Sequence, residues 1–145
     1  MNQPPESQEI PLAAIGYVYS AKAGSHGAAK VSVARRAVIQ FAAQQGLQLV
    51  GCEADMGLNC RVARRAVRKA MAHGWPHVLV VPALSHLSRS PAFAAKIIDR
   101  LLARGQHIVT CDGQLDSRTR PGRLLLGMMQ ALSELEAQIS PARFH

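Results

Sequence analysis

The sequence predicts one α/β domain, in which a mostly parallel, four-stranded, Rossmann-like sheet carries helices on both faces and forms three layers. The first observation is that short apolar runs alternate with amphipathic stretches of helical length along the 145 residues, a pattern typical of strands connected by helices. The second is that a glycine separates a predicted helix from the next apolar run three times, at Gly46, Gly74 and Gly105. Glycine tolerates the left-handed conformation that ends many helices. Three helix–glycine–strand joints therefore favour βαβ units, whose strands are parallel and whose crossovers are right-handed.

Each element follows from its own apolar pattern. The predicted strands are residues 12–19, 47–54, 77–81 and 107–111. The predicted helices are residues 31–45, 61–73, 91–104 and a last, long helix that opens at Pro121. Pro91 and Pro121 suit the first turn of a helix, where a missing N–H is harmless. Residues 20–30 are small and polar and contain glycine, so they predict a loop.

Composition narrows the class of protein. We expect a flexible lead at residues 1–11, a single domain at 12–139 and a tail at 140–145, with no membrane span, because no apolar run reaches the ~18–20 residues required. Three cysteines without a CxxC pair, and a start without a secretory signal, favour a reducing cytoplasm. No histidine or cysteine spacing matches a metal site, and no phosphate-loop motif is complete, so neither a metal nor a cofactor is expected.

The charge is strongly positive. Seventeen Lys and Arg against nine Asp and Glu give a net charge of +8, which favours polyanions such as nucleic acid, although it is also compatible with a charge that serves solubility. Four arginines of the basic helix recur at the spacing of one helical face, and Lys69 follows them. The candidate anion-binding residues there are Arg61, Arg64, Arg65, Arg68 and Lys69. A DNA backbone would offset their repulsion; the alternative is a solvated basic face.

Two further arginines, Arg120 and Arg123, surround the start of the last helix. Free N–H groups and the helix dipole favour anions at such an end. The same stretch is also suited to a turn and helix cap, and both interpretations stay open.

The last helix is apolar around more than one face. A surface helix normally carries one apolar stripe, so this helix predicts a second partner, most simply the same helix of another subunit in a homodimer. The candidate interface residues are Leu124, Leu125, Met128, Met129, Leu132 and Leu135. The alternative is that the sheet and neighbouring helices of the same chain cover them.

Two segments carry a resemblance to a known family. Residues 78–90, VLVVPALSHLSRS, predict a buried strand ending in a polar turn, and residues 115–139, LDSRTRPGRLLLGMMQALSELEAQI, predict a turn that opens the last helix. In this order and at this distance they resemble the catalytic domain of the serine recombinases, the resolvase/invertase family. The resemblance implies a resolvase-like sheet whose long terminal helix dimerises and leads towards DNA. It also implies a metal-free reaction, in which a serine attacks a DNA phosphodiester while arginines hold the phosphate.

Four positions match the functional residues of that family: Tyr17, Asp55, Arg64 and Arg89. Four others differ from it. The family's first-strand arginine falls on Tyr19 and its nucleophile on Ala21, while an acid and an arginine of the third-strand turn become Ser85 and His86. Family members also continue into a separate DNA-binding domain. Residues 140–145 do not resemble that domain, and Pro141 is expected to end the last helix.

Ser20 is the one serine near the expected nucleophile position, one residue early. Along a strand, a shift of one residue reverses the direction of the side chain, so Ser20 is expected to face away from the phosphate pocket unless the strand end bulges. The resemblance therefore implies an inactive domain that dimerises and associates with DNA or a partner protein. Two alternatives stay open: an active recombinase that uses Ser20, and a module that binds an anionic small molecule or protein in the former phosphate pocket.

Overall fold

The computed structural model describes residues 10–139, so residues 1–9 of the expected lead and the expected tail at 140–145 lie outside the described part. Its four strands are β1 (Ala13–Ser20), β2 (Gln48–Met56), β3 (Val78–Val81) and β4 (His107–Thr110). They form one sheet in the order β2-β1-β3-β4, and every pair of neighbours is parallel. The predicted fold class is thus confirmed.

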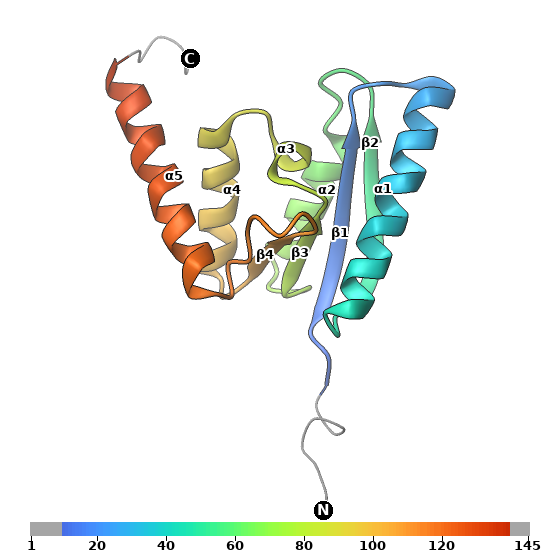
Figure 1. Ribbon diagram of the computed structural model, residues 1–145, viewed down its shortest axis with the longest axis horizontal. Helices are drawn as coiled ribbons and strands as arrows, with labels where there is room; N and C mark the ends of the chain where they lie inside the picture. Colours follow the sequence, from blue (N-terminus) through green and yellow to red (C-terminus); the bar gives the residue numbers. More distant parts are fainter. Residues whose placement is uncertain (1–9, 140–145) are drawn as a thin grey trace, which may run out of the picture.

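Five helices surround the sheet in the described residues: α1 (Gly24–Gln44), α2 (Val62–Met71), α3 (Leu84–Leu87), α4 (Pro91–Ala103) and α5 (Arg120–Ile139). α1 covers one face, whereas α2 and α4 cover the other. The long helix α5 packs against α4 on the outside of the molecule (Figure 1). No helix among residues 10–139 has the length and apolar character needed to cross a membrane.

The alternation of β1 decides which side chains reach which face. Ala14 and Val18 join the core under α1, whereas Tyr17 joins the core under α2 and α4. Gly16 lies on the α1 side, and a Cβ there would come within 2.7 Å of Val38 Cγ1, so close packing of α1 on the sheet requires glycine. Since side chains alternate along a strand, Tyr17 and Tyr19 share the face that looks towards α2.

Two local predictions were wrong. The expected loop at 20–30 is mostly helix, because α1 begins at Gly24. A Cβ on Gly27 would lie 2.1 Å from the Lys22 carbonyl oxygen; the small residues therefore serve close packing of the first helical turn rather than a loop. The expected turn after β3 contains the one-turn helix α3, whose His86 and Leu87 carbonyls are held by arginine side chains of the α2 region.

The two ends of the parallel strands lie next to different elements. The carboxyl ends of β1, β2 and β3 meet at one edge, together with the start of α2 and with α3 (Figure 1). After β4 the chain turns back, with an antiparallel bridge between Val109 and Asp116, and Arg118 reaches Gln45 after α1. α5 therefore begins at the opposite edge and runs back along α4 (Figure 1).

Candidate functional site

Asp55 is the centre of a polar cluster at the carboxyl ends of β1 and β2. Its side chain is buried and accepts a 2.6 Å hydrogen bond from the Tyr17 hydroxyl. It also accepts hydrogen bonds from the backbone N–H groups of Ala63, at 2.8 Å, and Arg64, at 3.0 Å. Those two groups belong to the first turn of α2, whose own N-cap residue, Arg61, makes no side-chain cap. Asp55 therefore caps α2 from a neighbouring strand.

The hydrogen bonds around Asp55 set its charge state. Burial alone would raise its pKa, but the bonds from Tyr17, Ala63 and Arg64 outweigh burial and lower the pKa, since they favour the carboxylate. The Tyr17 pKa is raised, first by burial and then by its bond to Asp55. At neutral pH the pair is a carboxylate and a neutral phenol, with the phenol as donor.

Two arginines tie α3 to this cluster. Arg61 Nη1 donates to the Tyr17 hydroxyl at 3.2 Å and to the His86 carbonyl at 2.6 Å, and its guanidinium lies 3.6 Å from the centroid of the Tyr19 ring. Arg64 Nη1 donates to the Leu87 carbonyl at 2.7 Å. The guanidiniums thus fix a backbone turn and stack on an aromatic face.

His86 stands at a position where the family has an arginine. Its Nδ1 accepts a 3.0 Å hydrogen bond from the Tyr19 backbone N–H, so a neutral ring carries its proton on Nε2. Burial, and next the charge of Arg61, lower the His86 pKa. The ring is therefore neutral at pH 7 and cannot supply the cation that it replaces.

Above the cluster lies a pocket of about 300 Å³, which we call the guanidinium pocket. Its lining residues are Tyr19, Leu58, Asn59, Arg61, Arg64, Ser88, Arg89 and Ser90. The pocket gathers three predicted anion-binding residues, Arg61, Arg64 and Arg89, from separate segments, with Tyr17 and Asp55 beneath. Arg64 Nε is buried and has no hydrogen-bond partner among residues 10–139. A buried donor left without a partner costs free energy.

Ser20 lies apart from that pocket. Its hydroxyl donates to the Lys22 carbonyl and accepts from the Lys22 N–H, both at 3.1 Å. It lines a depression together with Tyr19, Ala21, His86 and residues of α1, and none of the arginines of the guanidinium pocket lines that depression. Pairing between β1 and β2 continues without a shift from Ile15 to Ser20, and the one irregularity falls between Ala14 and Ile15. The strand end therefore has no bulge that would turn Ser20 towards the arginines.

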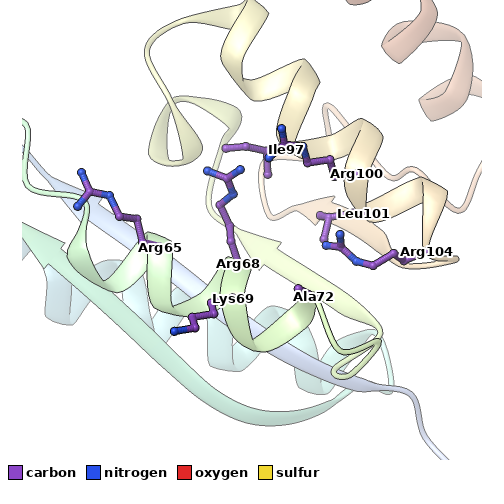
Figure 2. Close-up of a pocket in the computed structure, with 8 residues that line it drawn as sticks. All are labelled: Arg65, Arg68, Lys69, Ala72, Ile97, Arg100, Leu101 and Arg104. Carbon is purple, nitrogen blue, oxygen red and sulfur yellow. The ribbon is translucent and has the colours of Figure 1, made fainter.

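The remaining predicted cations lie elsewhere. Arg65, Arg68 and Lys69 line a groove between α2 and α4 (Figure 2), so the single basic face expected from the sequence is divided between two sites. Arg123 donates to the Arg118 carbonyl at the start of α5. Arg120 and Arg123 lie in the first turn of α5, and α5 begins at the end of the sheet opposite the carboxyl ends of β1 and β2 (Figure 1).

The predicted interface residues of α5 also divide into two groups. Leu125 and Met129 are partly buried and pack against the core of their own chain. Four others form an exposed stripe: Leu124 is 64% exposed, Met128 63%, Leu132 57% and Leu135 50%. Their spacing of three or four residues puts them along one side of the helix.

Three residues take part in the polar cluster although the sequence did not predict a role for them: Tyr19, Cys60 and His86. Tyr19 and His86 entered only as departures from the family pattern, yet they support Arg61 and each other. Cys60 places its Sγ 3.7 Å from Asp55 Oδ1. An aromatic residue at the strand end beside an arginine-rich helix was the available signal for the Tyr19–Arg61 stack. Among residues 10–139, no group of three or more His, Cys, Asp or Glu side chains is arranged to bind a metal ion.

Comparisons with known proteins place this geometry in context. The family model described as Resolvase, N terminal domain matches residues 16–145, whereas no curated protein matches the sequence. A resolvase family site-specific recombinase from Streptococcus pneumoniae superimposes with a TM-score of 0.80 at 15% identity, covering 92% of this chain and 93% of that one. The N-terminal catalytic domain of TP901-1 integrase gives a TM-score of 0.73 at 16% identity, covering 88% and 98%. The C-terminal catalytic domain of ISC1926 TnpA, an IS607-like serine recombinase, gives 0.61 at 15% identity, covering 88% and 83%.

Proposed function

This chain belongs to the resolvase family of serine recombinases, and we propose that it is a family member without strand-cleavage activity, which dimerises and associates with DNA or with a partner protein. The observation that carries the proposal is the engagement of the Ser20 hydroxyl by the Lys22 backbone, on the α1 side of β1. Covalent cleavage needs a hydroxyl and the phosphate-binding arginines around one phosphorus atom. Ala21 occupies the nucleophile's place, and Ser20 bonds to the Lys22 backbone beside α1 instead.

The loss of two charged side chains supports the same conclusion. Tyr19 and neutral His86 stand where the family has arginines, and each missing donor to a developing negative charge is worth roughly 3–4 kcal/mol in transition-state stabilisation. Arg61 and Arg64 remain, but both donate to backbone carbonyls of α3. The pocket therefore retains positive charge suited to holding a phosphate, without the group that would attack it.

Binding to DNA is supported by the retained pocket and by the net charge of +8. Arg61, Arg64 and Arg89 converge on one pocket. A backbone phosphate would supply acceptors to these donors without requiring a particular base sequence.

Dimerisation is supported by the exposed stripe of α5. Leu124, Met128, Leu132 and Leu135 are each at least half exposed on a helix whose other side packs against α4. A continuous apolar stripe of this kind is typical of a subunit interface, and the same stripe of a second copy would cover it.

Incubation with supercoiled plasmid, followed by a denaturing quench, tests the absence of cleavage. We expect no nicks and no covalent protein–DNA adduct from the wild-type chain. Ser20→Ala is compared with Ser25→Ala, an exposed serine of α1. An adduct that disappears in Ser20→Ala but persists in Ser25→Ala would overturn the proposal in favour of an active recombinase that uses Ser20.

Retention of a short DNA duplex at increasing salt concentration tests whether the chain associates with DNA through the guanidinium pocket. Arg89→Gln should weaken retention and reduce the salt slope by about one. Arg36→Gln removes the same charge from an exposed position on α1 and should change retention little.

A second candidate function is favoured by the small size of the guanidinium pocket, about 300 Å³, and by its arginine lining: the pocket would bind an anionic small molecule or an acidic side chain of a protein. Absence of any DNA retention at low salt, combined with binding of such an anion that is lost in Arg89→Gln, would favour this function over DNA association.

Light scattering tests whether the exposed apolar stripe of α5 is a dimer interface. We expect a dimer, converted to a monomer by Leu132→Glu, because a buried unpaired carboxylate at an interface is strongly unfavourable. Val33→Glu introduces the same change at an exposed apolar position of α1 and should leave the dimer intact. A wild-type monomer at high concentration would refute this part of the proposal.

A further inference from the structure

The groove between α2 and α4 is the second place where cations gather, and we call it the α2–α4 groove. Its volume is about 250 Å³. Ile97, Leu101 and Ala72 are its apolar lining residues, and its cationic lining residues are Arg65, Arg68, Lys69, Arg100 and Arg104. The ends of the Arg65 and Lys69 side chains extend away from α4 (Figure 2). Figure 2 shows Arg68 projecting from α2 into the space before α4, which carries Arg100 and Arg104.

No acidic side chain lines this groove in the described part of the chain. α2 contains none. The one acid of α4, Asp99, forms a hydrogen bond with the Gln130 side chain of α5, so it faces the other side of its helix. The single ion pair among residues 10–139 joins Arg118 to Asp116, at the start of α5.

The charges of the groove repel one another without compensation. Burial, and next the charges of Arg100 and Arg104, lower the pKa of Arg68. Arginines held together in this way destabilise the fold unless a ligand offsets the repulsion. If these arginines had a purely structural role, we would expect an acidic side chain to pair with them, as Asp116 pairs with Arg118.

Two of the guanidiniums are held in position by neutral groups. Arg104 Nε donates to Gln106 Oε1 at 2.9 Å, and the buried Gln106 amide donates in turn to the Met71 and Pro76 carbonyls. The Arg68 guanidinium lies 5.4 Å from the centroid of the Phe93 ring. Within residues 10–139 the terminal Nη groups of both arginines donate to no protein acceptor. The groove is therefore preorganised and retains donors for a ligand.

We propose that the α2–α4 groove is a second anion-binding site, which takes a ligand carrying adjacent phosphate groups. Residues 65–71 of α2 span about 9 Å at 1.5 Å per residue, a length that covers roughly three phosphates of one DNA strand or one extended polyphosphate. The site goes beyond the function proposed above, because none of its residues lines the guanidinium pocket. Two sources could supply this chemistry, the DNA backbone and a soluble polyphosphate.

Binding measurements with two probes test the site and distinguish the sources. Calorimetry compares tripolyphosphate with orthophosphate, and fluorescence anisotropy follows a short DNA duplex at several salt concentrations. The test variant is Arg68→Gln/Arg100→Gln. The control, Arg36→Gln/Lys96→Gln, removes the same charge from exposed positions on α1 and on another face of α4. Thermal unfolding checks that both variants are folded.

For a soluble source, tripolyphosphate binds at least about tenfold more tightly than orthophosphate, and the test variant loses about tenfold in affinity. For a backbone source, the salt slope of duplex binding falls by about two in the test variant, while tripolyphosphate binding is weak. The control changes neither measurement by more than about twofold. If the test variant behaves like the control with both probes, the site does not exist. Failure of Arg89→Gln to affect DNA retention would instead contradict the guanidinium pocket alone.

Discussion

The guanidinium pocket and the α2–α4 groove both take arginines from the α2 region, but they use them in opposite ways. In the pocket, Arg61 and Arg64 donate to the carbonyls of His86 and Leu87 and lie beside the carboxylate of Asp55. In the groove, Arg68 faces Arg100 and Arg104 with no acid nearby. The same residue type therefore supports the fold in one region and opposes it in the other.

This difference separates structural from ligand-directed charge. An arginine whose N–H groups are used by backbone carbonyls contributes to stability, and its removal leaves buried acceptors without partners. An arginine that faces other arginines contributes little to stability, and its removal relieves repulsion. Stability measurements can thus distinguish the two regions without knowledge of any ligand.

Substitution of Asp55 should cause the largest loss of stability. Asp55→Ala removes the acceptor of the Tyr17 hydroxyl and of two N–H groups that begin α2, and we expect the free energy of unfolding in urea to fall by about 3 kcal/mol. Asp55→Asn keeps one acceptor oxygen and should cost less. Glu53→Ala, at an exposed position of the same strand, is the control; an equal loss there would contradict the capping role of Asp55.

Arg64 and Arg68 compare the two regions directly. Arg64→Gln should lower the free energy of unfolding by roughly 1–2 kcal/mol, because the Leu87 carbonyl loses a charged donor. Arg68→Gln should leave stability unchanged or slightly higher at low salt. Urea unfolding of both variants at low and high salt is the measurement. Equal destabilisation by the two substitutions would mean that Arg68 is as structural as Arg64.

His86 should give a smaller effect that depends on pH. Its pKa is lowered in the folded chain, so the unfolded chain binds more protons near pH 6.5 and stability falls as the pH drops below about 6.5. His86→Asn keeps an acceptor for the Tyr19 N–H but does not titrate, and should flatten this part of the stability curve. His107, whose pKa is also lowered, contributes in the same direction, so His107→Asn is the matched comparison. An unchanged curve in His86→Asn would exclude the titration of His86 as its source.

Local sequence signals predicted the strands and most helices because those signals act over a few residues. Gly46, Gly74 and Gly105 all have positive φ angles, as their places between helix and strand required. The region of residues 20–30 could not be predicted in this way, since small residues serve loops and closely packed helical turns equally well. Only the approach of Gly27 to the Lys22 carbonyl decides between them.

For the guanidinium pocket and the Asp55 cluster, the sequence predicted several of the residues but not their contacts in space. Asp55, Arg64 and Arg89 could be singled out from the family pattern, whereas the cap that Asp55 provides for α2 spans eight and nine residues and depends on how β2 meets that helix. Arg100 and Arg104 carried no sequence signal, since spacing along one helix says nothing about charges on another.

By itself, the sequence determined the α/β class, the four strands and the resemblance of residues 78–90 and 115–139 to the resolvase family, because periodicity, helix ends and motifs are local. The tertiary structure alone decided that the end of β1 has no bulge, that Leu125 and Met129 pack against the core, and that the arginines of the basic helix line two different pockets. The physical reason is that the direction of a side chain and the sign of its neighbours depend on contacts between distant segments, which form only when β1, α2, α3 and α4 come together.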